Sequence, residues 1–185
     1  RVRHPSVVTF MGAAVQFPTQ DSPEQSRWRV GLVFELCGGG NLFNRIHEGK
    51  QKYTGRQKIT IAKEIAMGLS YLHSLNIIHR DLSSRNILLT DDKLHAKIAD
   101  FGCARQIVGD RYNSTTISGS PCWMSPEQLA GGALTLRADV WSYGIMLWEL
   151  AKEQLPHGHG APDLGKMRDF IFQTVLDVPS RECLQ

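Results

Sequence analysis

Three side chains in the middle of the sequence have the types and spacing needed to move a phosphoryl group. Asp81 lies within His79-Arg80-Asp81-Leu82, Asn86 follows it, and Asp100 begins the tripeptide Asp100-Phe101-Gly102. A carboxylate can accept the proton of an attacking hydroxyl group, and carboxylate and amide oxygens can hold the magnesium ions that bridge the phosphates of ATP. The pattern therefore predicts Asp81 as the catalytic base and Asn86 and Asp100 as metal ligands.

The residues between Asn86 and Asp100 predict a hairpin. Two short apolar runs, 87–89 and 96–99, flank a turn-like stretch at 91–93. Because a hairpin brings its two ends together, we expect Asn86 and Asp100 to meet at one metal cluster. Asp81 would lie just upstream, within reach of the acceptor hydroxyl group.

Taken in order, these motifs resemble those of the protein kinase catalytic domain, and the resemblance extends from about Arg3 to about Leu155. Ser125-Pro126-Glu127 stands where the family has Ala-Pro-Glu, and residues 139–144 resemble its central helix motif. Four motifs in this order are highly specific, whereas a single Asp-Phe-Gly would carry almost no weight. The resemblance implies an α+β fold with a small β-rich N-lobe, a mostly helical C-lobe, and ATP and Mg²⁺ as cofactors.

The resemblance covers only part of that domain. Residues 1–36 would be a remnant of the N-lobe, and residues 37–185 would be the hinge and a C-lobe without its last helices. The glycine-rich phosphate loop, the strand lysine and the helix glutamate of the family have no counterpart in the sequence. We therefore expect an active intact parent and a weakly active or inactive fragment, because the missing parts supply positioning and charge.

The hinge and the nucleotide-binding positions follow from the same resemblance. The implied nucleotide-binding residues are Glu35, Cys37, Asn41 and Leu88. The Glu35 carbonyl and the Cys37 amide would bond the adenine edge, and Asn41 would face the ribose. Glycines 38–40 would let the backbone leave a strand and start a helix. Phe34 would be the gatekeeper that narrows any pocket beyond the adenine, and a core position on a buried strand is compatible with that role.

Apolar patterns predict the elements that position these residues. Runs at 7–13 and 28–36 predict paired strands. Apolar residues at three- and four-residue intervals over 61–72 predict an amphipathic helix that leads to His79, and 138–151 predicts a helix buried nearly all round. By resemblance, Asp139 would hold the loop around His79; its alternative is a charge favoured by the helix dipole.

The polar stretch between Asp100 and Glu127 corresponds to the kinase activation segment. Arg80 would dock a phosphate on this segment, because an Arg fork binds phosphate oxygens bidentately. The candidate sites for an upstream activating kinase are Thr115, Thr116 and Ser118. The alternative for each is a solvated loop hydroxyl group.

Acceptor specificity rests on two signals that disagree. Residues 119–124 resemble the Gly-Thr-Pro-x-Trp-Met loop of serine/threonine kinases, with Ser120 in place of threonine as a further catalytic position. Ser83 stands two residues after Asp81, where such kinases usually carry Lys, and Arg85 stands where one tyrosine kinase pattern has Arg. The mixture is most like the tyrosine-kinase-like group, which mainly phosphorylates Ser and Thr; a tyrosine or dual-specificity kinase is the alternative. The missing charge at Ser83 implies slow turnover or a cation supplied by another residue.

Composition narrows the remaining classes. The sequence has 185 residues, 42% of them hydrophobic, a net charge of +3 and four scattered cysteines. This suits one domain with a substantial core and reduced thiols, and it offers no dense basic run for nucleic acid and no apolar run of membrane-spanning length. We expect a cytoplasmic enzyme that acts on protein substrates. A pseudokinase or scaffold module is the competing hypothesis, against which the intact carboxylates argue.

Overall fold

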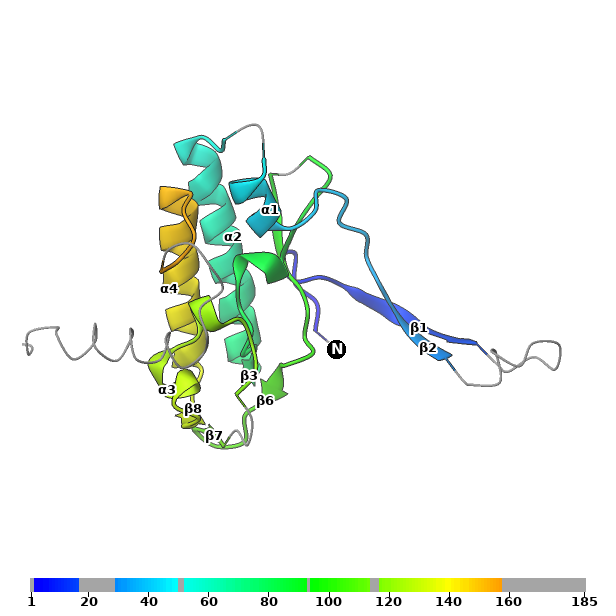
Figure 1. Ribbon diagram of the computed structural model, residues 1–185. Helices are drawn as coiled ribbons and strands as arrows, with labels where there is room; N and C mark the ends of the chain where they lie inside the picture. Colours follow the sequence, from blue (N-terminus) through cyan, green and yellow to red (C-terminus); the bar gives the residue numbers. More distant parts are fainter. Residues whose placement is uncertain (1, 17–28, 50–51, 93, 114–116, 158–185) are drawn as a thin grey trace, which may run out of the picture.

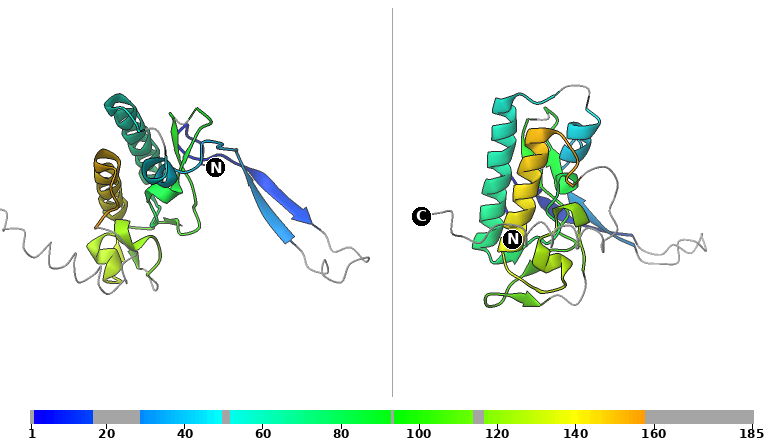
Figure 2. Two further views of the ribbon diagram at one scale, coloured as in Figure 1. Left: turned by 45° about the horizontal axis from the view of Figure 1, so that its top comes forward. Right: turned by 60° about the vertical axis from the view of Figure 1, so that its left-hand side comes forward.

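The computed structural model describes residues 2–16, 29–49, 52–92, 94–113 and 117–157, which form a helical body and a projecting hairpin. Helices α2 (Gly55–Ser74) and α4 (Arg137–Lys152) lie side by side in the body. The hairpin of β1 (Phe10–Gln16) and β2 (Arg29–Phe34) extends away from them (Figure 1). The two further views show the same separation of hairpin and helices (Figure 2).

Helix α2 begins at a complete capping box. The Thr54 side chain accepts a hydrogen bond from the Gln57 amide, and the Gln57 side chain accepts one from the Thr54 amide. Its apolar face is buried at Ile61, Ile65, Leu69 and Leu72. The helix predicted over 61–72 is therefore confirmed, and it extends further at both ends.

Helix α4 is buried along one face only. Its buried residues are Ala138, Asp139, Ser142, Met146, Glu149 and Leu150. This helix packs on α2, and its Tyr143 hydroxyl group donates to the Ala62 carbonyl over 3.0 Å. Val140, Leu147 and Trp148 are 52%, 36% and 42% exposed. The prediction of a helix buried nearly all round was wrong, because no element within the described ranges covers this side.

The β1–β2 hairpin is antiparallel, with pairs running from Phe10 opposite Phe34 to Gln16 opposite Arg29. Most of its apolar side chains are exposed: Phe10, Met11, Val15, Val30, Leu32, Val33 and Phe34. Phe34 is 43% exposed, so the expectation of a core position on a buried strand was wrong.

The predicted strand at 7–13 divides between two partners. Val8 is buried and donates its amide to the carbonyl of Ile98 (2.9 Å), at the end of β5 (Ala96–Ile98). The amide of Ile98 in turn donates to the Ser6 carbonyl over 2.9 Å. Strand β1 therefore starts only at Phe10, after the chain has left β5.

Short elements complete the body. They are α1 (Leu42–His47), β3 (Ile77–Ile78), η2 (Ser84–Asn86), β4 (Ile87–Leu89), β6 (Arg105–Gln106), β7 (Tyr112–Asn113), η3 (Pro121–Trp123), α3 (Pro126–Leu129) and β8 (Ala133–Leu134), where η marks a 3-10 helix. Strands β4 and β5 pair from Ile87 opposite Ile98 to Leu89 opposite Ala96, which confirms the predicted hairpin. Within the described parts of the chain, no helix is both long and apolar enough to span a membrane.

Candidate active site

The Asp81 carboxylate is held by Ser120. Its Oδ1 atom accepts hydrogen bonds from the backbone amide and the hydroxyl group of Ser120, both at 2.8 Å. Asp81 lies between β3 and η2, whereas Ser120 directly precedes η3. No hydrogen bond from a described residue reaches Oδ2, so the carboxylate is oriented while one oxygen stays open to a substrate hydroxyl group.

Asn86 and Asp100 lie at the base of the β4–β5 hairpin. The side-chain amide nitrogen of Asn86 donates to the Asp81 carbonyl over 2.8 Å, which leaves its Oδ1 atom for a cation. The Ala99 amide donates to the Asn86 carbonyl over 2.8 Å, so the backbone next to Asp100 lies against Asn86. Asp100 has a left-handed backbone (φ 59°), and both side chains line one cavity. An amide oxygen and a carboxylate at one place suit a hard cation such as Mg²⁺.

This cavity has a volume of about 520 Å³, which is within the usual range for small-molecule sites. Apolar walls come from β2 and β4, including Leu32 and Leu88. Asn86 and Asp100 contribute oxygens to the same cavity. An apolar wall together with cation ligands fits a nucleotide base and its phosphates.

Glu35 lines the cavity and anchors the end of β2. Its Oε1 atom accepts hydrogen bonds from the Thr9 amide (2.7 Å) and from the Lys97 ammonium group (3.1 Å). Partial burial alone would raise the pKa of the Glu35 carboxyl, but the bonds from Thr9 and Lys97 outweigh it and lower the pKa. The side chain therefore has a structural task, and an adenine contact through its carbonyl stays a prediction.

The glycine segment after Glu35 turns the chain onto β4. The Gly39 amide donates to the Leu89 carbonyl over 3.1 Å, and a side chain at Gly39 would collide with the Thr90 carbonyl. Gly40 has φ 77°, a conformation that glycine adopts without strain. These contacts confirm the expected role of the glycines in leaving a strand and starting a helix.

Cys37 and Asn41 are not among the residues that line the cavity. The Asn41 side chain caps α1 by accepting from the Asn44 amide over 2.8 Å, and its backbone lies beside Leu88. Burial and the nearby Glu35 charge raise the pKa of the Cys37 thiol. A ribose contact by Asn41 and an adenine contact by Cys37 both stay predictions.

Asp139 of α4 holds the loop before Asp81. Its two carboxylate oxygens accept from the His79 amide at 2.8 Å and the Arg80 amide at 2.9 Å, and the His73 ring lies 3.0 Å away. Asp139 is 1% exposed. The expected role of Asp139 is confirmed, because the contact reaches across the fold and is not simply a charge at a helix start.

The Arg80 side chain points toward the activation segment. Its guanidinium group donates to the Ser118 hydroxyl (3.0 Å) and the Cys103 carbonyl (3.3 Å), and it lies 4.8 Å from the centroid of the Tyr112 ring. Gln128 of α3 donates to the carbonyls of both Arg80 and Ser118. The predicted pairing of Arg80 with Ser118 therefore has the required proximity.

The other two candidate phosphorylation sites, Thr115 and Thr116, lie outside the described residues.

Glu149 is a site-organising residue that the sequence reasoning missed. This fully buried carboxylate accepts from the Ser84 hydroxyl (2.8 Å) and the Trp123 indole (2.9 Å), and it lies 2.8 Å from the His47 ring. It thereby connects α4 to α1, η2 and η3. A detectable signal was an acidic residue on the same helical face as Asp139, within an apolar run.

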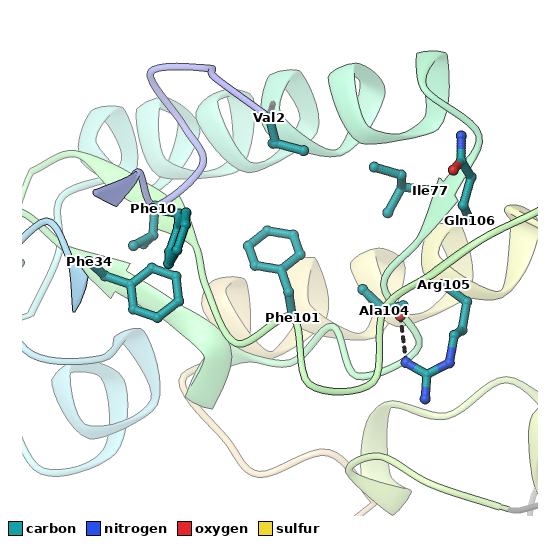
Figure 3. Close-up of a pocket in the computed structure, with 9 residues that line it drawn as sticks. Val2, Phe10, Phe34, Ile77, Phe101, Ala104, Arg105 and Gln106 are labelled. Carbon is teal, nitrogen blue, oxygen red and sulfur yellow. Dashed lines mark hydrogen bonds between the residues drawn. The ribbon is translucent and has the colours of Figure 1, made fainter. Parts of the chain in front are cut away.

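A second cavity, of about 470 Å³, lies beyond Phe34 and Phe101. Figure 3 shows Phe34 beside Phe10 at one side of this space and Phe101 in the middle, between Phe34 and Ile77. Phe34 and Phe101 also line the first cavity. Phe34 therefore lies where the two cavities meet, and its role as a gatekeeper beyond the adenine stays a prediction.

The comparisons with known proteins agree with this geometry. The family model of protein tyrosine and serine/threonine kinases matches residues 1–169. The chain belongs to the protein kinase family. It is 40% identical over 166 residues to serine/threonine-protein kinase TNNI3K of Mus musculus, a match that covers 88% of this chain and 19% of the relative. Serine/threonine-protein kinase CTR1 of Arabidopsis thaliana is 37% identical over 166 residues, with the same two shares. Mitogen-activated protein kinase kinase kinase 13 of Mus musculus is 32% identical over 157 residues, or 85% of this chain and 15% of the relative.

Membership of the kinase family confirms the resemblance and the α+β fold class inferred from the sequence. The relatives are serine/threonine kinases of the tyrosine-kinase-like type, as the mixed pattern at Ser83 and Arg85 indicated. Members of this family generally use ATP and Mg²⁺ and act on protein substrates. The kinase chain spans about a fifth of the length of the first of these curated relatives.

Proposed function

We propose that the full-length protein containing this chain transfers the γ-phosphoryl group of ATP to Ser or Thr hydroxyl groups of a protein substrate. The observation that supports this best is the oriented Asp81 carboxylate next to Asn86, with Asn86 and Asp100 on one nucleotide-sized cavity. Relatives named as serine/threonine kinases support the choice of acceptor.

Each residue of the site has a separate part in the reaction. Asp81 accepts the proton of the substrate hydroxyl group, because its Oδ2 atom is open while Ser120 holds Oδ1. Asn86 and Asp100 hold magnesium, which neutralises charge on the phosphates when it is bound. Leu88 and the neighbouring apolar wall contact the base.

The side chains next to Asp81 at the acceptor end are small and polar. The Ser120 hydroxyl lies 2.8 Å from Asp81 and 3.5 Å from the hydroxyl of Ser83. Ser83 is fully buried, so the side chains of Ser83 and Ser120 form a polar wall beside the catalytic base Asp81. Because the relatives are named as serine/threonine kinases, a Ser or Thr hydroxyl group is the acceptor that we propose.

Regulation belongs to the same proposal. An upstream kinase would phosphorylate the activation segment at Thr115, Thr116 or Ser118, and the phosphate would bind Arg80 in charge-assisted hydrogen bonds. The 3.0 Å contact between Arg80 and the Ser118 hydroxyl supports Ser118 as one such site. Mutation of all three residues to Ala should abolish activation of the full-length protein by an activating treatment, measured as peptide phosphorylation.

The test of the function is the Asp81→Asn variant of the full-length protein. Phosphate transfer to a peptide should fall by about 10²–10⁴-fold because the general base is lost, while ATP affinity stays within about twofold. Asp110→Asn, at an exposed position, is the matched control and should keep full activity. Transfer that survives Asp81→Asn would refute the assignment, and phosphoamino acid analysis separates Ser/Thr from Tyr. Residues 1–185 alone should turn over ATP weakly at most.

A further inference from the structure

The segment that carries Asp81 and the segment that carries Ser120 lie in very close contact. Gly119 directly precedes Ser120, and a β-carbon at Gly119 would come within 2.7 Å of the Arg80 carbonyl oxygen. Gly119 also has φ 124°, a backbone conformation that is strained for residues with a side chain. Arg80 itself has a left-handed backbone (φ 69°). Such conformations persist only where surrounding groups hold them, so the contact beside the catalytic base needs support from elsewhere.

One side chain joins the two segments at this point. The side-chain amide nitrogen of Gln128 donates to the Arg80 carbonyl over 2.7 Å and to the Ser118 carbonyl over 2.9 Å. Arg80 directly precedes Asp81. Ser118 lies two residues before Ser120. Because Gln128 is only 4% exposed, water competes little for these bonds. The amide group therefore connects the segment that carries the base to the segment that orients it.

The two acceptors match the chemistry of a primary amide. The side-chain nitrogen of glutamine carries two hydrogens, so one group can donate to two carbonyl oxygens at once. A carboxylate of the same size is an acceptor only, and a thioether of similar length donates nothing. Loss of the donor would remove a partner from two carbonyl groups in a buried region, which favours separation of the segments. Glutamine therefore has the donor count that this contact needs.

Gln128 is also held in place from its own side. Its backbone amide donates to the Ser125 carbonyl over 3.0 Å at the start of α3. The next residue, Leu129, packs against Met124, and both are buried. A side chain that starts from a fixed backbone and ends on two acceptors can position the groups it binds.

We propose that Gln128 is a positioning residue for phosphoryl transfer, which aligns Ser120 with the catalytic base Asp81. This inference rests on the proposed function, because it concerns the same transfer step. Two hydrogen bonds of 2.8 Å join Ser120 to one oxygen of Asp81, so a small movement of residues 118–120 would turn the carboxylate away from the substrate hydroxyl group. Gln128 is not among the residues that line the nucleotide cavity, so its effect is on the acceptor side.

The covalent changes of the step do not involve Gln128. The bond from the γ-phosphorus to the bridging oxygen of ADP breaks, a bond to the acceptor oxygen forms, and the hydroxyl proton passes to Asp81. Gln128 acts only through the backbone carbonyls that it binds, on either side of this proton transfer.

The first test compares Gln128→Met and Gln128→Glu with wild type in the full-length protein. Both variants lose the double donor, so kcat for a peptide should fall by about 10–100-fold, while KM for ATP stays within about twofold. Gln128→Glu keeps the size of the side chain, so a loss in this variant cannot come from altered packing volume. Gln154→Met and Gln154→Glu, at an exposed position, are the matched controls and should keep full activity. An unchanged kcat in Gln128→Glu would overturn the proposal.

A second test separates this inference from the proposed function, because it needs no transfer to a peptide. Amide hydrogen exchange is measured at Ser120, whose N–H group donates to Asp81. In Gln128→Met this exchange should be at least about tenfold faster, because the segment separates more easily, while the amides of α2 exchange as in wild type and show that the variant is folded. Unchanged exchange at Ser120 would overturn the role of Gln128. Absent transfer in wild type, together with faster exchange in the variant, would refute only the proposed function.

Discussion

The β1–β2 hairpin and helix α4 are both rich in apolar residues, yet they differ in which side chains they bury and which they expose. In the hairpin, Val30 and Leu32 are 67% and 64% exposed. In α4, the buried face contains the carboxylates of Asp139 and Glu149, at 1% and 0% exposure. Helix α4 thus buries charged side chains, whereas the hairpin exposes large apolar side chains.

The difference shows that the burial of a side chain depends on which neighbouring groups are available to contact it. Asp139 meets the backbone amides of the catalytic loop, and Glu149 meets donors from three other segments. A buried carboxylate is tolerated when its hydrogen-bonding capacity is met. Among the described residues, the hairpin has no set of contacting groups comparable to those around Asp139 and Glu149. The catalytic geometry therefore depends on the helical body, and the hairpin supplies walls at one end of the cavity.

Asp139→Ala should produce the largest effect and would test the dependence on α4 directly. Removal of the carboxylate leaves the buried amides of His79 and Arg80 without their acceptors, at a cost of about 3–5 kcal/mol. Urea unfolding of the full-length protein measures this loss. Glu48→Ala, an exposed acidic position, is the control. A loss below about 1 kcal/mol would show that α4 does not fix the loop.

Leu72→Ala and Val30→Ala compare how much a side chain of the helical body and a side chain of the hairpin contribute to stability. Leu72 is fully buried in α2, so its truncation should cost about 2–5 kcal/mol of unfolding free energy. Val30 is 67% exposed in β2, and its truncation should change stability by less than about 0.5 kcal/mol. Equal losses in chemical denaturation would break the comparison, because they would mean that the hairpin is covered in the full-length protein.

Glu149→Gln should have an intermediate effect. The amide keeps the size of the side chain but accepts with one oxygen instead of two, so one of the donors from Ser84, Trp123 and His47 loses its partner. We expect a loss of about 1–3 kcal/mol and a change in tryptophan fluorescence. Glu48→Gln is the matched control. Unchanged emission and stability would show that Glu149 does not connect these segments.

His95→Gln should have the smallest effect, confined to low pH. The hydrogen bond to Glu64 (2.6 Å) raises the pKa of His95 above its ordinary value of 6.5. The pair therefore contributes its full stability below about pH 6.5, and this is lost as pH rises through the folded-state pKa. His95 is largely exposed, so the contribution is small. Unfolding at pH 6 and pH 8.5 should separate the variant from wild type only at pH 6; a larger difference at pH 8.5 would contradict this sign.

The sequence was sufficient for features that depend on residue type and short spacing. The hairpin at 87–98 was predictable because two apolar runs flank a polar turn. The hydrogen bonding of Asp139 to the loop around His79 followed from the family motif. The division of 7–13 was not predictable, since an apolar run does not indicate whether β5 or β2 will be its partner. The role of Glu149 was not predicted from the sequence for a similar reason. Its donors come from positions 47, 84 and 123, which meet only in the folded chain.

The uncovered hairpin has a consequence for the behaviour of the chain at high concentration. Strand β1, Phe10–Gln16, has no charged residue and no proline, and each strand of the two-stranded sheet has one edge without a strand partner among the described residues. Such an edge can template the addition of further strands from other molecules, and an uncharged, mostly apolar segment of seven residues is the kind that stacks in this way. Whenever this ribbon is uncovered, as during synthesis, it is a natural site for chaperone binding and a starting point for aggregation.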